Sequence, residues 1–494
     1  MKKFFRAVCV LILVSASAVR APGEDSPGVV LNDIHSALNE TRVREVYQPA
    51  SAAEIADVIK KAKAQNAAVS ISGGRHAMGG QQFGADTLHI DMSRMNRILA
   101  FDRKQGRLTV EAGAQWPEIV KYLLKEQEGQ KKQWGVIQKQ TGASTLSIGG
   151  TLSANAHGRG LLFKPIIDQV ESFVLVDADG EIKRCSRSEN AELFRLVIGG
   201  YGLFGVIAEA TLRLGPRQKV ERVVELSNLT DLMKKFDERI AQGFTHGDFQ
   251  YLTDPTSQGF LWEGVFPCYR PVPDETPLTK DPKVQNEADW RGLYYLSHAD
   301  PKKAFLKYSQ YYLSTSGQVY WSDTADLANY IEGYHEEVDR RTGTKNPGSE
   351  MITEIYVPRG KLADFMQEVR ADFLQHNVPI IYGTIRLVEK DGESFLAWAR
   401  DNWACVIFNL HVEHTPEGIA KATEDFQRLI DRAIEFQGSY YLTYHRWARK
   451  DQVLACYPQF VQFLKLKLKY DPQERFQSEW YRHYREMFGE ELAK

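Results

Sequence analysis

The sequence predicts an α+β fold with two domains, and three observations support this prediction. Helix-like and strand-like segments are mixed along the chain without the repeating strand–helix–strand rhythm of a doubly wound sheet. The length of 494 residues exceeds what one hydrophobic core usually supports, which favours two domains. Three glycine-rich segments interrupt the first part of the chain, and such segments suit a ligand-binding surface better than a packed core.

The composition is that of an ordinary globular protein without a charge bias. Hydrophobic residues make up 43% of the chain and charged residues 26%, as expected for a soluble protein. The 62 Lys and Arg residues nearly balance the 64 Asp and Glu residues, so the net charge is −2. Because no basic run is present, we expect neither nucleic acid nor an anionic membrane as a partner.

The first part of the chain, up to residue 215, mixes helices and strands. Ser51 and Glu54 form a capping box that opens an amphipathic helix. Residues 170–185 resemble a β-hairpin that turns at Asp179-Gly180. The expected helices are 53–66, 116–127 and 190–197, and the other expected strands are 68–72, 87–91, 107–114 and 206–214.

Gly215-Pro216 marks a plausible boundary, after which a second domain is expected. A helix over residues 229–242 precedes a proline-rich stretch, residues 268–282, that we expect to run over the surface. Three strand-like runs then suit an antiparallel sheet with helices on one face: residues 351–358, 380–388 and 404–413. The alternating lysines of residues 465–469 are expected on a solvated face.

The first glycine-rich segment, residues 71–84 (ISGGRHAMGGQQFG), follows a short apolar strand and has His76 at its centre. Backbone without side chains can close around a pyrophosphate because its N–H groups then point at the negative charge. A tight surface turn is the alternative interpretation of this segment taken alone.

Two further glycine-rich segments strengthen the first interpretation. Residues 141–160 carry almost only small or hydroxylic side chains, which suits a surface laid flat against a rigid ligand. Residues 198–207 follow a predicted helix and run into a strand. None of the three segments spells G-x-G-x-x-G inside a strand–helix–strand unit, so a nicotinamide-binding fold is not indicated.

In this order and spacing, the three segments resemble the FAD-binding domain of the vanillyl-alcohol oxidase superfamily, also called the PCMH type. The resemblance extends to its cytokinin dehydrogenase, alditol oxidase and aldonolactone oxidase branches. In the first branch the loop reads G-R-G-H-S-x-N-G-Q, and residues 73–81 fall on it without a gap. Ala77 and Gly79 depart from that pattern, which has serine and asparagine there. The likeness covers roughly residues 40–215 and, more loosely, residues 467–476.

The resemblance implies that FAD is the cofactor. His76 matches the histidine that carries a covalently bound flavin in many members, and a simple contact with phosphate is the alternative. No cysteine lies in the second segment, so a second covalent attachment is excluded. The residues implied as FAD-binding are Gly73, Gly74, Arg75, His76, Ala77, Gln81, Gly142, Ser147, Gly149, Gly150, Ser153, His157, Gly158, Gly205 and Ile207.

The resemblance also implies a domain layout. A two-part FAD-binding domain of the PCMH type would comprise residues 28–215 and a C-terminal segment, residues 454–494, that returns to it. An α+β substrate domain with an antiparallel sheet, called the cap below, would comprise residues 216–453.

Candidate catalytic residues lie in the cap. Tyr382 and Arg386 alternate along one strand, where alditol oxidases place a glutamate and an arginine that face the substrate. Thr384 stands where that glutamate is expected, which departs from the polyol-oxidising pattern. His411 lies on the next strand, and His445 belongs to a segment similar to the H-W-G-K element of aldonolactone oxidases. The alternative for each of them is a structural role.

The implied function is FAD-dependent oxidation of a CH–OH group in an alcohol, sugar, polyol or lactone by hydride transfer. Oxygen or a quinone-like acceptor would then reoxidise the flavin. Two alternatives stay open: oxidation of an amine or of an aromatic or lipid-linked substrate, and a flavin-binding protein without turnover.

The N-terminus has the layout of a secretory signal peptide over residues 1–21, with basic residues before a short apolar stretch. We therefore expect a secreted or periplasmic protein with no membrane span after cleavage. An uncleaved anchor is the alternative. The four later cysteines are far apart and form no C-x-x-C, so no metal site is expected, and their pairing is open. Cys405, inside an apolar run, is expected to be buried.

Overall fold

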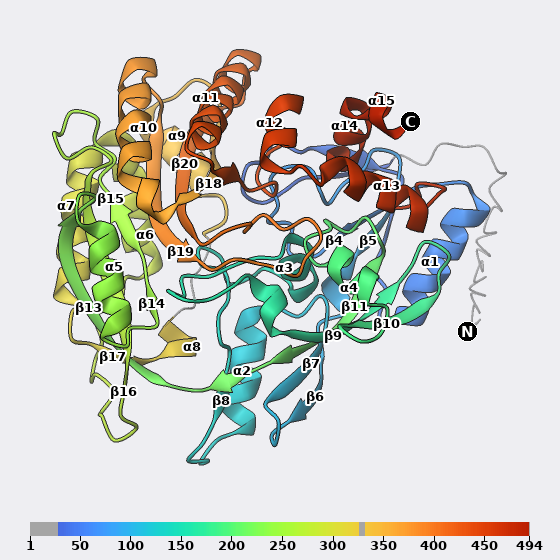
Figure 1. The fold of residues 1–494 in the computed structure, drawn as a ribbon, viewed down its shortest axis with the longest axis horizontal. Helices are drawn as coiled ribbons and strands as arrows, with labels where there is room; N and C mark the ends of the chain where they lie inside the picture. The colour runs from blue at the N-terminus through green and yellow to red at the C-terminus, as the bar shows by residue number, and fades with distance from the viewer. Residues whose placement is uncertain (1–27, 326–330, 494) are drawn as a thin grey trace, which may run out of the picture.

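The computed structural model describes residues 28–325 and 331–493. It has two parts, one built around two small sheets and one around a single large sheet (Figure 1). A continuous cluster of buried hydrophobic side chains runs through both parts. The predicted α+β class is confirmed by this mixture of helices with antiparallel sheets. The predicted signal peptide lies outside the described residues.

The first part contains a three-stranded parallel sheet in the order β3-β5-β4 and a five-stranded antiparallel sheet in the order β10-β9-β11-β7-β6. Two small pairs, β1-β2 and β12-β8, accompany them. The strands are β1 Val29–Leu31, β2 Thr41–Val43, β3 Glu45–Tyr47, β4 Val69–Ser72, β5 Leu88–Asp91, β6 Ile98–Asp102, β7 Arg107–Glu111, β8 Trp134–Gly135, β9 Val170–Val176, β10 Ile182–Ser186, β11 Val206–Arg213 and β12 Gly215–Pro216. The helices are α1 Ala52–Ala64, α2 Trp116–Glu126, α3 Ile148–Ala154 and α4 Ala191–Val197.

Local sequence signals account for several of these elements. Ser51 caps α1, because its side chain accepts a hydrogen bond from the backbone N–H of Glu54 at 3.2 Å. The carboxylate of Glu54 reaches the N–H of Ala50 at 2.9 Å rather than that of Ser51, so the box closes one residue earlier than predicted. The hairpin of β9 and β10 turns at Gly180, whose φ of +79° suits glycine.

The second part is a nine-stranded antiparallel sheet in the order β17-β13-β16-β15-β19-β20-β18-β21, with β14 paired to β16. The three predicted strands are present as β18, β19 and β20 and lie side by side toward the β21 edge of the sheet. The strands are β13 Lys219–Asn228, β14 His246–Gly247, β15 Phe249–Tyr251, β16 Glu263–Val272, β17 Val319–Trp321, β18 Gly348–Pro358, β19 Ile380–Val388, β20 Trp403–Glu413 and β21 Ser439–Tyr440. The helices are α5 Leu232–Ala241, α6 Glu287–Ala299, α7 Pro301–Ser314, α8 Ser322–Ala325, α9 Tyr334–Thr342, α10 Leu362–His376 and α11 Pro416–Glu435.

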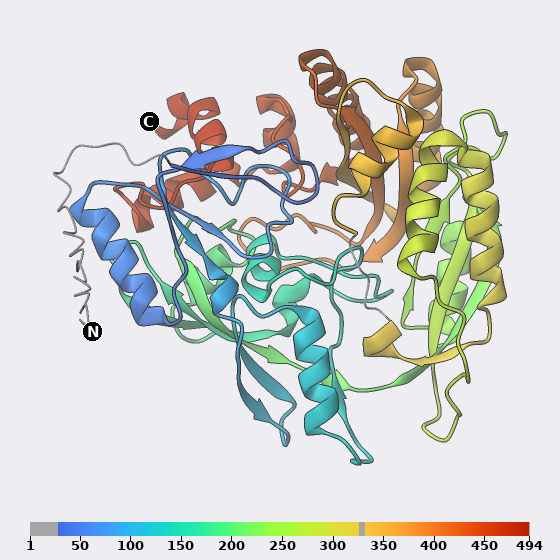
Figure 2. The ribbon, with the colours of Figure 1, turned by 180° about the vertical axis from the view of Figure 1, so that it is seen from behind.

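Helices cover both faces of the large sheet, so the expectation of one covered face is wrong. Helices α5 and α10 stand before the sheet in Figure 1, and α6 and α7 stand before it in the reverse view of Figure 2. The alternation of β18 explains this. Thr353 turns toward the α11 side, where it contacts His445, whereas Glu350 and Glu354 turn the other way, into the central cavity.

The proline-rich stretch is not wholly a surface loop. Residues 268–272 belong to β16, which pairs with β13 along its whole length, from Glu263 opposite Asn228 to Val272 opposite Lys219. The loop-forming residues begin only after Val272. Pairing with long neighbouring strands therefore overrides the local preference of the two prolines, Pro267 and Pro271.

The C-terminal helices return to the first part of the molecule, as Figure 1 shows in red beside β4 and β5. They are α12 Lys450–Cys456, α13 Phe460–Tyr470, α14 Glu479–Met487 and α15 Gly489–Leu492. Val69 of β4 exchanges backbone hydrogen bonds with Arg475 and Gln477, at 2.6 and 2.9 Å. The lysine run lies on α13, and the expectation of a solvated face is wrong for Lys467, which is fully buried and paired with Asp471.

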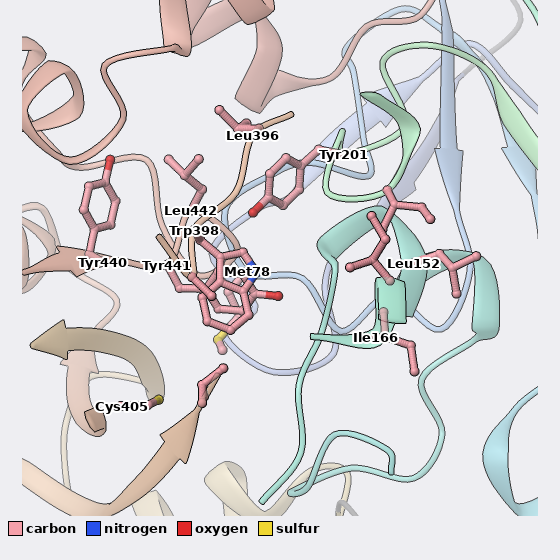
Figure 3. Close-up of a cluster of buried hydrophobic side chains, with 14 of the residues drawn as sticks. Met78, Leu152, Ile166, Tyr201, Leu396, Trp398, Cys405, Tyr440, Tyr441 and Leu442 are labelled. Atoms are coloured by element: carbon pink, nitrogen blue, oxygen red, sulfur yellow. The ribbon is translucent and has the colours of Figure 1, made fainter. Parts of the chain in front are cut away.

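The two parts meet through buried apolar side chains (Figure 3). Met78 and Tyr201 come from the first and third glycine-rich segments, whereas Trp398 and Tyr441 come from the cap. The indole N–H of Trp398 donates to the carbonyl of Asn155 at 3.1 Å, and the hydroxyl of Tyr441 donates to the carbonyl of Ala154 at 2.6 Å. These contacts hold the glycine-rich segments against the cap.

Within the described residues, no helix combines the length and the apolar content that crossing a bilayer requires. The cysteines Cys185, Cys268, Cys405 and Cys456 are free and buried, which confirms the expected burial of Cys405. Burial holds the pKa of the Cys405 thiol well above its usual value, so this side chain is unreactive.

Candidate active site

One cavity of about 1170 Å³ lies between the glycine-rich segments and the large sheet. Its first end is formed by the predicted cofactor-binding residues, all of which line it except Gly158. The side chains of β18, β19 and β20 and of helices α6 and α7 form the other end. Segments separated by more than 200 residues along the chain therefore share one cavity.

The first two glycine-rich segments touch where side chains are missing. A Cβ atom on Gly73 would overlap the hydroxyl of Ser147, and one on Gly74 would lie 2.6 Å from the carbonyl oxygen of Thr145. Gly74 donates its backbone N–H to the Ser147 hydroxyl at 3.4 Å. A side chain at Gly74 would collide with backbone of the second segment, and one at Gly73 would collide with the Ser147 side chain, so both contacts depend on glycine.

Gly158 lies just outside the cavity because it packs against the chain before the second segment. A Cβ atom on Gly158 would lie 2.5 Å from the carbonyl oxygen of Lys139, and its N–H donates to the Gln138 side chain at 3.3 Å. Close packing against the backbone of Lys139 therefore explains why residue 158 is a glycine.

The His76 ring is held by two partners in the cavity wall. Its Nδ1 lies 2.8 Å from Nε2 of His35, and its Nε2 lies 3.0 Å from the Thr145 hydroxyl. Burial, with a smaller contribution from Arg75, lowers the pKa of His76 to about 4. The imidazole is therefore neutral at pH 7, and one of its ring nitrogens keeps a lone pair that can act as a nucleophile.

The donor set at this end of the cavity fits a dinucleotide cofactor with two phosphates. The lining is bare backbone and small hydroxylic side chains with Arg75 as a cation. The hydroxyl of Thr141 is buried and has no hydrogen-bond partner among the described residues, so a ligand atom could satisfy it. The observed lining therefore fits FAD.

The middle of the cavity holds a buried pair between the two parts. His157 of the second segment lies 2.8 Å from Oε2 of Glu354 on β18. Hydroxyls of Tyr356 and Tyr444 also donate to Glu354, at 2.8 and 2.9 Å. Burial raises the pKa of Glu354, but His157, Arg386 and Tyr356 outweigh it and lower the pKa to about 2. This carboxylate is therefore ionised at pH 7.

A second carboxylate, Asp248, lies beside Thr384 in the cavity wall. Asp248 lies between β14 and β15 and is buried in the cavity wall. Its Oδ2 accepts hydrogen bonds from Thr384 at 3.0 Å and from the Gln250 amide at 2.7 Å. Its Oδ1 accepts no hydrogen bond within the described residues and lies 3.6 Å from Arg159.

Tyr382 and Arg386 both line the cavity, as alternation along β19 predicts. The Tyr382 side chain is 39% exposed and lines this cavity. Burial of its hydroxyl raises the pKa of that group, and the charge of Asp248 raises it further. The Nε of Arg386 is buried without a hydrogen-bond partner among the described residues.

His411 lies one layer behind the cavity surface. It stands directly opposite Glu350 in the pairing of β18 with β20, and its Nδ1 is 3.4 Å from the Glu350 carboxylate. Glu350 lines the cavity, whereas His411 does not. Any effect of His411 on a substrate therefore passes through Glu350.

His445 is not brought to the cavity, which corrects the expectation that it faces the substrate. It lies on the opposite face of β18, where its Nε2 is 3.2 Å from the Thr353 hydroxyl. Its ring stacks on Phe426 and Trp447, at centroid distances of 4.6 and 5.6 Å. Burial alone lowers its pKa to about 3. This histidine is part of the packing between α11 and the sheet.

Sequence reasoning missed Glu354 and Asp248. A usable signal existed for Glu354, an acidic residue at an inward position of a predicted strand, whereas Asp248 lies in the short connection between β14 and β15. An ionisable residue at such a position has to find a partner, and here the partners lie at the cavity.

Comparison with known proteins supports the interpretation of the first part. Residues 43–186 match the FAD binding domain family. L-gulonolactone oxidase of Mus musculus is 24% identical over 450 residues, which cover 87% of this chain and 92% of that protein. An uncharacterized oxidoreductase of the fasciation locus of Rhodococcoides fascians is 32% identical over 186 residues, 37% of this chain and 41% of that protein.

The mitochondrial L-galactono-1,4-lactone dehydrogenase of Arabidopsis thaliana is 27% identical over 274 residues, 52% of this chain and 42% of that protein. The chain thus spans nearly the whole mouse relative but less than half of the length of the other two. The matched domain and these relatives together show an FAD-dependent oxidoreductase with an FAD-binding domain of the PCMH type, similar to members of the vanillyl-alcohol oxidase superfamily.

Proposed function

We propose that this protein oxidises a CH–OH group of a small sugar lactone, sugar or polyol by transferring a hydride to FAD. The observation that carries the proposal is the single cavity, which joins the glycine-rich segments to a cluster of ionisable cap residues. The mouse and Arabidopsis relatives are named for aldonolactones, which favours a lactone as the first substrate to test.

The glycine-rich segments would hold FAD, and His76 would contact its ring system. Bound FAD supplies the hydride acceptor, so the chain itself has to position the substrate and receive the hydroxyl proton. Because His76 is neutral at pH 7, we further propose that it is the covalent attachment point.

Asp248 is the proposed proton acceptor. Thr384 and Gln250 hold its Oδ2, which leaves Oδ1 to accept the proton of a substrate hydroxyl. Arg386, whose Nε has no partner among the described residues, would stabilise the oxygen as negative charge develops on it. Glu354 would keep Arg386 oriented, since its charge acts on both His157 and Arg386.

The test is anaerobic reduction of the flavin by each compound in a panel of aldonolactones, aldoses, alditols, aryl alcohols and amines. The loss of the flavin's visible absorbance measures the reduction. We expect at least one compound with a CH–OH group to bleach the flavin. Asp248→Asn should slow this reduction by roughly 10² to 10⁴-fold. The matched control is Asp254→Asn, another buried aspartate that does not line the cavity. Equal rates in both variants would rule out Asp248 as the base.

Covalent attachment has a separate test. The yellow colour should stay with the protein after acid denaturation, and His76→Ala should release it while flavin binding persists. If the denatured wild-type protein is colourless, His76 is a contact residue only, and the oxidase proposal is unaffected.

A bulky aromatic substrate is the second candidate, and the cap end of the cavity favours it. Aromatic side chains dominate that wall, among them Trp290, Tyr294, Tyr308, Tyr312 and Tyr320. Aromatic rings stack on flat apolar ligands. The same panel distinguishes the two candidates, because aryl alcohols would then bleach the flavin faster than lactones or sugars.

Two further proposals concern the surroundings of the enzyme. Oxygen or a quinone-like compound would reoxidise the flavin, which an oxygen electrode and a dye-linked assay separate. The basic and apolar pattern of residues 1–21 supports export to the periplasm or the medium, which cell fractionation tests.

A further inference from the structure

Four elements meet at the carboxylate of Glu350 in the cap. Glu350 lies on β18, His298 on α6, His335 on α9 and His411 on β20. Nε2 of His298 is 2.7 Å and Nδ1 of His411 is 3.4 Å from Oε1 of Glu350. Nδ1 of His335 is 2.7 Å from Oε2. We call His298, Glu350 and His411 the histidine–glutamate cluster. The reaction proposed above uses none of these residues.

The hydrogen bonds of His298 place either a proton or a metal ion between its Nε2 atom and Glu350. Its Nδ1 lies 2.9 Å from the carbonyl oxygen of Tyr294, which can only accept, so Nδ1 carries a hydrogen. A neutral ring then has a lone pair on Nε2, and that lone pair faces the carboxylate at 2.7 Å. Two acceptors at this distance require either an added proton or a metal ion between them.

The three side chains can also reach the ligand positions of a metal site. The donor atoms of His298, Glu350 and His411 all lie within 4.8 Å of one another. His411 stands directly opposite Glu350 in the β18–β20 pairing, so the sheet itself fixes two of the three ligands. Zinc sites with bonds of about 2.0 to 2.2 Å place ligand atoms roughly 3.3 Å apart, which small side-chain rotations reach from here.

The surroundings of the cluster have the second layer of contacts that metal sites use. A histidine ligand usually donates its other N–H to a carbonyl or carboxylate, as His298 does to Tyr294. The other oxygen of Glu350 is held by His335 and by the hydroxyl of Tyr334, both from α9. These contacts fix the carboxylate so that Oε1 points at the two histidines.

We propose that His298, His411 and Glu350 bind a divalent transition-metal cation of the zinc class. Imidazole nitrogens with one carboxylate select zinc and its neighbours over Mg²⁺ or Ca²⁺, which prefer oxygen ligands. Three protein ligands leave a fourth position for water or substrate. Of the three ligands, Glu350 lines the substrate cavity, whereas His298 and His411 lie behind it. The ion would also join α6 and α9 to the sheet (Figure 1). Helix α9 contacts both α6 and β18, and β18 pairs with β20.

The experiment measures metal binding by the flavin-loaded protein, independently of turnover. The protein is stripped with a chelator, incubated with Zn²⁺, desalted and analysed for metal by plasma mass spectrometry. We expect about one Zn²⁺ per chain. Titration with Co²⁺ should add visible bands at longer wavelengths than the flavin absorption, typical of nitrogen and oxygen coordination.

Variants locate the site. His411→Gln and Glu350→Gln should each weaken Zn²⁺ binding by 100-fold or more, and His335→Asn should weaken it by roughly 10- to 100-fold because it removes an outer contact. His376→Gln, on α10, is the matched control, since His376 also has a carboxylate partner, Asp372 at 3.9 Å, and lies away from the cluster. It should bind Zn²⁺ like the wild type.

The outcomes decide the proposal without relying on any one variant. Wild-type protein that takes up no Zn²⁺ or Co²⁺ overturns it and shows that a proton holds the cluster together. Uptake that His411→Gln leaves unchanged also overturns it, because the metal then lies elsewhere. If Glu350→Gln does not fold, the wild-type stoichiometry and the His411→Gln affinity still give the answer.

Discussion

Nε2 of His157 and Oε2 of Glu354 lie 2.8 Å apart, and both residues are almost completely buried. They come from the second glycine-rich segment and from strand β18 of the cap, 197 residues apart in the chain. This one contact joins the part of the cavity that would hold the cofactor to the part that would hold the substrate.

Glu354→Gln should reduce the free energy of unfolding by about 3 kcal/mol at pH 7, because it removes an ionised partner from a buried pair. The pKa of Glu354 is lowered in the folded state from 4.5 to about 2. Its contribution is therefore present above pH 4.5 and is lost as the pH falls toward 2. Urea denaturation at pH 7 and at pH 3 should show the difference from wild type shrinking at the lower pH.

The control for that variant is Glu435→Gln, which removes an exposed ion pair with Arg432. It should change stability by less than about 1 kcal/mol at either pH. A Glu354→Gln effect no larger than this control would mean that the buried pair adds nothing to stability.

Gly73→Ala should prevent stable flavin binding. The added methyl group overlaps the Ser147 hydroxyl, so the first two glycine-rich segments have to separate. Gly360→Ala is the matched control, since a Cβ there meets nothing within 4 Å. The ratio of flavin to protein absorbance after purification is the measurement. Full flavin content in Gly73→Ala would contradict the role assigned to this contact.

His445→Phe should leave the rate of flavin reduction unchanged, because His445 lies on the sheet face away from the cavity. The variant's stability should also fall less than that of the wild type when the pH is lowered. Burial lowers the pKa of His445 from 6.5 to about 3, so its neutral form stabilises the fold above pH 6.5 and that stability is lost as the pH falls toward 3. Each unit of difference corresponds to about 1.36 kcal/mol. Melting temperatures between pH 7 and pH 4 test this, and a large loss of activity at pH 7 would restore a catalytic role.

Arg386→Lys should lower the rate constant for flavin reduction by roughly 10²-fold. A lysine keeps the charge but loses the Nε donor, which has no partner among the described residues. Arg400→Lys serves as the control: its Nε is also buried without a partner among the described residues, but it does not line the cavity. Rapid-mixing absorbance under anaerobic conditions measures both variants. Similar rates for both would remove Arg386 from the proposed mechanism.

The cofactor end of the site could be predicted from the sequence because its chemistry is local. Gly73, Gly74 and Ser147 are recognisable since missing side chains and short hydroxyls are themselves the feature that a phosphate-binding backbone needs. The alternation of β19 likewise predicted that Tyr382 and Arg386 share a face, which the cavity confirms.

The cap end could not be predicted in the same way. Thr384 left the predicted site without a carboxylate, but Asp248, from the connection between β14 and β15, accepts its hydrogen bond. His445 has a neighbourhood in the sequence that suggests catalysis, yet the pleat of β18 directs its partner Thr353 away from the cavity. Lys467 was expected on a solvated face, but α13 turns this side chain into the core, where it pairs with Asp471 four residues further on.

By itself the sequence determined the fold class, the backbone-lined cofactor segments and the alternating faces of the cap strands, because each of these depends on residues within one or two turns or strands of one another. Only the tertiary structure decided which ionisable side chains meet. Glu354 with His157, and Glu350 with three histidines, are pairings across distant segments, and these partners outweigh the effect of burial and lower the pKa of each carboxyl group. Local pattern carries no record of such contacts, since the free energy that selects them arises only when the segments are packed together.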